Sequence, residues 1–157
     1  MPSAKEPSPS GLRMGNAVQI GAVVRDIERA IEALQSLLGV GPVRRAEWPP
    51  PCSGIEGTYR GHPGDFSMSL AFAELGPIQL ELVQPLRGDS IYRDFLESKG
   101  QGLHHLLFDV SDIHAAAARL QARGIEVLQS GSGLVEGTQW AYFDTEETLG
   151  FVVEVRG

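Results

Sequence analysis

The chain has 157 residues, of which 42% are hydrophobic and 21% charged, a composition typical of one well-packed globular domain. Its formal net charge of −7 argues against broad electrostatic binding of nucleic acid or of anionic membranes. The single cysteine, Cys52, excludes a disulfide framework and a cysteine-rich metal site. We therefore expect a cytoplasmic protein with no nucleic-acid partner and no membrane partner.

The first half of the chain predicts a strand, a helix and three further strands. Residues 1–15 are rich in Pro, Ser and Gly and are expected to form a flexible tail without an apolar run of signal-peptide length. A strand-like run then ends near Val24, Asp26 occupies the N-cap position of a helix, and Gly39 ends that helix. Three strand candidates follow, GPVRRAEW, DFSMSLAFAEL and IQLELVQ, and a long, turn-rich loop precedes the second of them. We interpret this loop, residues 49–65, as either a lid over a binding site or a disordered segment.

The second half repeats this plan. Residues 88–101 are predicted to form a linking helix capped by Ser90. A strand from Gly102, a helix capped by Asp112 and the strand candidates IEVLQS, TQWAYFD and FVVEVRG then follow. The two halves align without a gap over the first strand and helix, which indicates an internal duplication. We predict a single α+β domain over residues 16–157, built from two tandem βαβββ modules, 16–87 and 102–157. Together they form a cupped, eight-stranded mixed sheet with the helices outside.

Alternation of side chains along the strands predicts which polar residues share the concave face of this sheet. Because successive strand residues point to opposite faces, Gln19, Glu81, His105 and Glu154 fall on the concave face. The same count places His104 towards the helices, where we expect a structural role with a hydrogen bond to the backbone. Two buried carboxylates without a partner would destabilise the fold by several kcal/mol or force one to be protonated. A bound cation would resolve this conflict.

These donors predict a site for one divalent metal ion. Imidazole nitrogen with carboxylate and amide oxygens suits Zn²⁺, Ni²⁺, Co²⁺, Mn²⁺ or Fe²⁺. Gln79 shares the face of Glu81 and is an alternative ligand in its place. The repeat also places a set of small polar and aromatic residues on strands around the concavity, where we expect them to line a substrate pocket: Ser67, Ser69, Trp140 and Tyr142.

The ligand candidates form two equivalent pairs, one from each βαβββ module. In this arrangement residues 16–157 resemble the vicinal oxygen chelate superfamily of glyoxalases, bleomycin resistance proteins and extradiol dioxygenases. The segment QPLRGDSIYRDFLESKGQGLHHLLFDVSDI is similar to methylmalonyl-CoA epimerases, which carry a comparable run into the metal-binding histidine. The set Gln, Glu, His, Glu resembles that of glyoxalase I. Where the epimerases carry a second carboxylate on the third strand, an ungapped alignment places Ser67.

The resemblance implies a metal-dependent isomerase, epimerase or lyase. Such an enzyme moves a proton next to the carbonyl or thioester of a small substrate through a metal-stabilised enolate, with Glu154, or else Glu81, as the base. The superfamily also includes metal-free small-molecule binding and resistance proteins, and this alternative stays open. An extradiol oxygenase is a third class, but it prefers two histidines and one carboxylate around iron. If the modules pair within one chain, an exposed sheet edge favours a homodimer.

Overall fold

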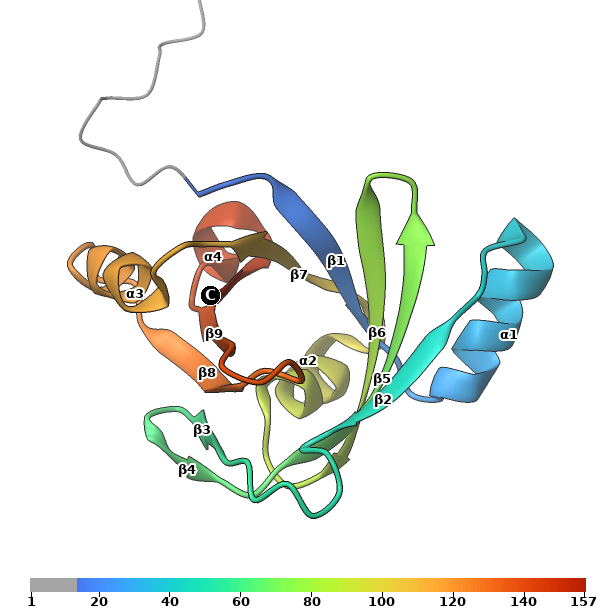
Figure 1. Ribbon diagram of the computed structural model, residues 1–157, viewed down its shortest axis with the longest axis horizontal. Helices are drawn as coiled ribbons and strands as arrows, with labels where there is room; N and C mark the ends of the chain where they lie inside the picture. The colour runs from blue at the N-terminus through green and yellow to red at the C-terminus, as the bar shows by residue number, and fades with distance from the viewer. Residues whose placement is uncertain (1–13) are drawn as a thin grey trace, which may run out of the picture.

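A computed structural model describes residues 14–157, so the predicted tail lies outside the described residues except for Met14 and Gly15. Within residues 14–157, a curled mixed sheet of ten strands and four helices make up the fold (Figure 1). None of these helices is long and apolar enough to cross a membrane. The elements of the first half are β1 (Ala17–Val23), α1 (Ile27–Leu38), β2 (Arg44–Trp48), β3 (Gly57–Tyr59), β4 (His62–Gly64), β5 (Ser67–Leu75) and β6 (Ile78–Arg87). After α2 (Ile91–Lys99) come β7 (Gly102–Asp109), α3 (Ile113–Gln121), β8 (Val127–Ser132), β9 (Gln139–Phe143), α4 (Glu146–Leu149) and β10 (Val152–Arg156).

The two halves pair within one chain through their first strands, β1 and β7, which are antiparallel. Each of these strands is also parallel to the last strand of its own half, β6 or β10. The registers match, since Glu81 is paired with Gly21 and Glu154 with Leu107, the residues two positions after Gln19 and His105. The duplication seen in the sequence is therefore also a geometric repeat.

The sheet has ten strands because residues 57–64 form the hairpin β3–β4, so the expected number of eight is wrong. β3 leaves its own half and pairs with β8 at the outer edge of the other half. The carbonyl oxygen of Ser132 on β8 accepts hydrogen bonds from the indole nitrogens of Trp48 (2.8 Å) and Trp140 (2.9 Å). Trp48 ends β2, the first strand of the sheet order, so its hydrogen bond links that strand to β8 near the other end of the curled sheet. The segment predicted to be a lid thus helps to close the cup.

Two helices cover the outer face of the sheet, as the apolar pattern predicts. α1 begins after Asp26, whose side chain accepts a hydrogen bond from the backbone N–H of Arg29. It packs Ile27 and Ile31 against Leu80 and Leu82. α3 begins after Asp112 in the same way and packs against the apolar residues of β9 and β10.

The linking helix α2 occupies a different place from the one expected. Ser90 caps it, as predicted, by accepting a hydrogen bond from the backbone N–H of Arg93. Its buried residues Ile91 and Tyr92, however, belong to the core cluster inside the cup and not to an outer layer. Figure 1 shows α2 within the ring drawn by the strands, with α1 and α3 outside it on opposite sides. The expectation that all helices lie outside is therefore wrong for α2.

Candidate metal centre

The four predicted ligands all lie buried on strands at the middle of the sheet. Gln19 is 3% exposed, Glu81 8%, His105 2% and Glu154 6%. They come from β1, β6, β7 and β10, which are consecutive neighbours in the order β6-β1-β7-β10. The apolar residues that flank the two glutamates point outwards to α1 and α3. Alternation along regular strands therefore accounts for the position of both carboxylates.

His105 stands between the two carboxylates. Its Nε2 is 3.1 Å from Oε2 of Glu81, to which it is hydrogen-bonded, and 3.3 Å from Oε2 of Glu154. One ring nitrogen has a single hydrogen, so it cannot serve both glutamates. Oε2 of Glu154 is indeed buried without a hydrogen-bond partner among the described residues. One donor atom from each of the three residues lies within 4.8 Å of the others, which is close enough to hold one metal ion.

Burial and charge shift the pKa values in this cluster. Burial raises the pKa of the Glu154 carboxyl most, the charge of His105 opposes this shift and Glu81 adds to it, with a result of about 8. Burial alone would lower the pKa of His105, but the hydrogen bond to Glu81 and the two carboxylate charges outweigh it and raise this pKa. Protons thus compensate for the crowded negative charge in the absence of a cation. A divalent cation would replace those protons.

Gln19 is held by a chain of amide hydrogen bonds. Its Nε2 donates to Oε1 of Gln79 at 2.8 Å, and Nε2 of Gln79 donates to Oε1 of Glu74 at the same distance. The nitrogen of Gln19 is therefore occupied, and its carbonyl oxygen is the atom left for a cation. Gln79, the alternative ligand in the sequence, serves in this arrangement as the partner that orients Gln19.

His104 also lies in the cup, so its predicted orientation towards the outer helices is wrong. Across the β1–β7 pair, Gly21 is opposite His105 but Ala22 is opposite Leu103, which leaves His104 as the extra residue of a β-bulge. The bulge breaks the alternation and turns both histidine side chains to the same side. Nδ1 of His104 is 2.9 Å from Nδ1 of His105, in place of the expected bond to backbone. Burial, followed by the charges of His105 and Lys99, lowers the pKa of His104 well below 6.5.

The wall that faces the acidic cluster is apolar. β5 turns Met68, Leu70 and Phe72 into the cavity that contains the cluster, which has a volume of about 370 Å³. Ser67 and Ser69, which we expected in this pocket, line grooves on the outside of the sheet, because they occupy the opposite positions of the same alternation. The alternation of large and small side chains in SMSLAF indicates that the face with Met68, Leu70 and Phe72 is the buried, inward face of β5. The one acidic residue of β5, Glu74, is exposed and hydrogen-bonded to Gln79, and it is not among the residues that line this cavity.

Trp140 and Tyr142, the two predicted aromatic residues, do line the cavity. Tyr142 is paired with Glu154 across β9 and β10, and its ring centre is 5.0 Å from that of His105. Burial, followed by the charges of Glu154, Tyr92 and Glu81, raises the pKa of Tyr142 well above 10, so its hydroxyl remains a proton donor. Its aromatic neighbours pack edge to face around the same cavity.

Sequence reasoning missed Tyr92 on α2 and Arg44 on β2, which also line this cavity. The apolar spacing of Ile91, Tyr92, Phe95 and Leu96 within the linking helix indicated a buried face, but not that this face looks into the cup. Arg44 is exposed, stacks over the ring of Phe72 at 4.2 Å and forms no ion pair within residues 14–157.

A second cavity, of about 390 Å³, lies beneath α3 on the outer face, away from the acidic cluster.

The sequence and the fold place the chain in a known family. Residues 18–143 match the model of the Glyoxalase/Bleomycin resistance protein/Dioxygenase superfamily, which covers most of the chain. The chain belongs to this superfamily, and the resemblance inferred from its duplicated modules is confirmed.

Relatives whose names state a function are epimerases of acyl-CoA thioesters. The uncharacterized protein YqjC of Bacillus subtilis is 33% identical over 92 residues, which cover 56% of this chain and 64% of that protein. Human mitochondrial methylmalonyl-CoA epimerase is 27% identical over 116 residues, 73% of this chain and 57% of that protein. The chain therefore spans less than two thirds of the length of either relative. The ethylmalonyl-CoA/methylmalonyl-CoA epimerase of Cereibacter sphaeroides is 38% identical over 68 residues, 43% of this chain and 51% of that protein.

Solved structures of the same kind share the fold. Methylmalonyl-CoA epimerase from Mycobacterium tuberculosis has a TM-score of 0.62 and 22% identity over 89% of this chain and 85% of that chain. A variant of the Streptomyces coelicolor enzyme in complex with 2-nitronate-propionyl-CoA has a TM-score of 0.67 and 20% identity, over 92% of this chain and 94% of that chain.

Proposed function

We propose that the chain is a metal-dependent isomerase, epimerase or lyase that moves a proton at the carbon next to a carbonyl or thioester group. The observation that carries this proposal is the buried, unpartnered Oε2 of Glu154, 3.3 Å from an imidazole nitrogen already hydrogen-bonded to Glu81. A buried carboxylate without a partner destabilises the fold, and a bound cation would remove this cost. The similarity to methylmalonyl-CoA and ethylmalonyl-CoA epimerases supports an acyl-CoA thioester as the substrate class.

The donor set fits one divalent metal ion from the group Zn, Ni, Co, Mn and Fe. We propose that Nε2 of His105, carboxylate oxygens of Glu81 and Glu154, and the amide oxygen of Gln19 hold it. When bound, the ion supplies Lewis-acid stabilisation of the negative charge that develops on a carbonyl or thioester oxygen. The two glutamates together neutralise its charge, which favours an ion that carries two positive charges.

Glu154 is the base in this proposal, with Glu81 as the second candidate. Oε2 of Glu154 has no hydrogen-bond partner among the described residues, so this oxygen is available to take up a proton and to return it. One oxygen of Glu81 is instead already hydrogen-bonded to His105. The proton would pass from the substrate carbon to an oxygen of Glu154 and back to the substrate from the same group.

The remaining lining gives the substrate a defined orientation. The apolar wall of Met68, Leu70 and Phe72 keeps water from the side opposite the carboxylates. The hydroxyl of Tyr142, which stays protonated, can donate a hydrogen bond to substrate oxygen. Arg44 lies at an exposed position of the same cavity, where an anionic end of the substrate would meet it. A thioester with one charged end suits this arrangement.

Proton exchange at carbon tests the function directly. Methylmalonyl-CoA and ethylmalonyl-CoA are incubated in D₂O with the protein loaded with Co²⁺, Zn²⁺, Ni²⁺ or Mn²⁺, and loss of the α-proton signal is followed by NMR. We expect exchange that stops when the metal is removed by a chelator. Glu154→Gln should slow this exchange by about 10²–10⁴-fold, while the exposed control Glu32→Gln should leave it unchanged. Metal uptake without exchange of any thioester would reject the reaction, and tight binding of small molecules without metal would favour the metal-free alternative.

We also propose a homodimer and a cytoplasmic location. β2 and β4 are the two outermost strands of the sheet order, and each keeps one edge without a strand partner among the described residues. Such edges support association with a second copy. Cys52 is exposed and in no disulfide, which agrees with a reducing compartment. The mass in solution, measured by light scattering, tests the dimer.

A further inference from the structure

We propose that His104 is a positioning residue for the metal centre: its Nδ1 accepts the hydrogen of Nδ1 of His105 and thereby aims Nε2 of His105 at Glu81 and Glu154. This inference rests on the proposed function, because it assigns a second residue to the same site. The observation that carries it is the 2.9 Å separation of the two Nδ1 atoms within the buried cup.

The β-bulge is what makes this contact possible. In a regular strand, adjacent residues point to opposite faces, and two neighbouring histidines would never meet. Here His104 has no partner in β1, since Gly21 is paired with His105 and Ala22 with Leu103. The extra residue turns the side chain of His104 into the cup beside that of its neighbour.

The chemistry of a ligand fixes the direction of this hydrogen bond. A histidine that binds a metal through Nε2 carries its proton on Nδ1, and this N–H requires an acceptor. The acceptor within reach is Nδ1 of His104, so the proton of the His104 ring lies on its own Nε2. A His105 ring that carries both hydrogens donates from Nε2 to Glu81 and from Nδ1 to His104, and a cation would replace only the hydrogen on Nε2. His104 therefore prepares the ligand before a metal binds.

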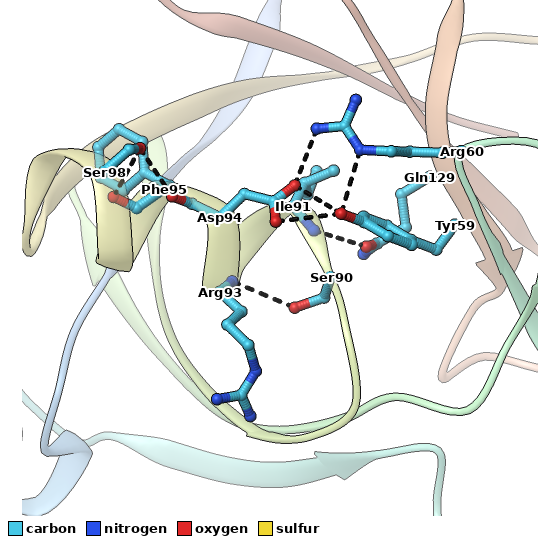
Figure 2. Close-up of polar contacts among 9 residues, drawn as sticks. All are labelled: Tyr59, Arg60, Ser90, Ile91, Arg93, Asp94, Phe95, Ser98 and Gln129. Atoms are coloured by element: carbon cyan, nitrogen blue, oxygen red, sulfur yellow. Dashed lines mark hydrogen bonds and ion pairs between the residues drawn. The ribbon is translucent and has the colours of Figure 1, made fainter.

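The linking helix in turn fixes His104. The ring of Phe95 packs edge to face against that of His104 at 4.9 Å between centres, and the ring of Tyr92 at 5.7 Å. Figure 2 shows how α2 is held: Oε1 of Gln129 accepts the backbone N–H of Ile91 at 3.0 Å, and Asp94 accepts hydrogen bonds from Tyr59 and Arg60 of the β3–β4 hairpin. The helix that joins the two modules and the extra hairpin thus both support the orientation of His105.

Two substitutions separate positioning from packing. His104→Phe keeps a flat ring against α2 but removes the acceptor, whereas His104→Asn loses the ring but offers an oxygen near the place of Nδ1. Affinity for Co²⁺ is measured by titration of each metal-free protein, together with the visible absorption spectrum of bound Co²⁺. We expect His104→Phe to weaken Co²⁺ binding by about 10- to 100-fold and to change the spectrum, and His104→Asn to stay within a few-fold of the parent.

The opposite ranking, or equal affinity in all three folded proteins, would overturn the inference. Nitrogen-15 NMR of the metal-free parent gives an independent answer: we expect hydrogens on both ring nitrogens of His105 and on Nε2 alone of His104, and a His105 ring with its hydrogen on Nε2 alone would reject the role of His104. If the parent takes up no metal, the proposed function fails, but the NMR result still decides the relation of the two histidines. The two failures are therefore distinguishable.

Discussion

Gly21 lies directly opposite His105 across the antiparallel β1–β7 pair, and a Cβ at Gly21 would meet the imidazole ring at 1.9 Å. The ring cannot yield freely, because Glu81 holds one of its nitrogens and His104 the other. A strand interior normally disfavours glycine, so the absence of a side chain here makes room for the imidazole. The site therefore depends on a residue that carries no functional group.

Gly21→Ala should displace His105 from its position between the carboxylates. We expect Co²⁺ affinity to fall by at least about tenfold and the free energy of unfolding to fall by about 1–3 kcal/mol, the usual effect of overpacking a core. Gly102→Ala on the neighbouring strand is the matched control, because its Cβ would meet only the ring of Phe95, at 4.0 Å. Equal effects of the two substitutions would show that the site does not depend on the absence of a side chain at Gly21.

Glu154→Gln should separate catalysis from stability. The amide cannot take a proton from carbon, so the rate of α-proton exchange should fall by about 10²–10⁴-fold. The same change removes a buried, unpartnered charge, so the metal-free variant should be more stable than its parent above pH 8. Exchange kinetics and thermal unfolding measure the two effects. A variant that retains full exchange with metal bound would exclude Glu154 as the base.

Stability of the metal-free protein should fall as the pH rises from about 5 to 9. The pKa of Glu154 is raised from 4.5 to about 8, so its favourable contribution is fully present below 4.5 and is lost as the pH passes about 8. The pKa of His105 is raised above 6.5, so its contribution disappears in the same direction. Urea unfolding at constant ionic strength should show this slope in the parent and a smaller one in Glu154→Gln. A parent that gains stability over this range relative to the variant would contradict the assignment.

The affinity for metal should rise with pH, whereas the stability of the metal-free protein falls. Each ion that binds must displace the protons held by Glu154 and His105, so affinity should rise with pH until both are deprotonated. Calorimetric titration of the metal-free protein with Zn²⁺ in two buffers of different ionisation enthalpy would count the protons released. Release of no protons at pH 7 would mean that these groups are not the ligands.

Gln19→His should tighten metal binding. Imidazole is a better ligand for the expected ions than an amide oxygen, and position 19 faces the cavity next to Glu81. Gln79, which now accepts from the Gln19 amide, would remain available to orient the new ring. Competition with a coloured chelator measures the affinity. An unchanged affinity would indicate that residue 19 does not coordinate the ion.

The sequence correctly predicted the positions of those site residues that depend only on regular alternation along a strand. Glu81 and Glu154 lie between apolar residues on strands without irregularities at these positions, so counting residues placed both correctly. His104 was misplaced because the bulge that turns it arises from the pairing of β1 with β7, which no local pattern records. Ser67 and Ser69 were misplaced because the repeat indicates which strands border the cavity, but not which face of β5 is turned towards it. The larger side chains of β5 line the cavity instead.

The hairpin at residues 57–64 was missed for a similar reason. Its strands have three residues each and contain Gly and Pro, which are typical of turns. They become strands only because β8, more than 60 residues further along the chain, offers an edge to pair with. The duplication, in contrast, was visible in the sequence because both halves use the same capped helix after the same strand.

The central claim is that Gln19, Glu81, His105 and Glu154 hold one divalent cation. Elemental analysis of protein purified without a metal-affinity tag, beside the His105→Ala variant, tests it most directly. We predict close to one equivalent of a single divalent metal in the parent and almost none in the variant, with both proteins folded. Metal content that is absent from the parent after incubation with each candidate ion, or unchanged in the variant, would contradict the account.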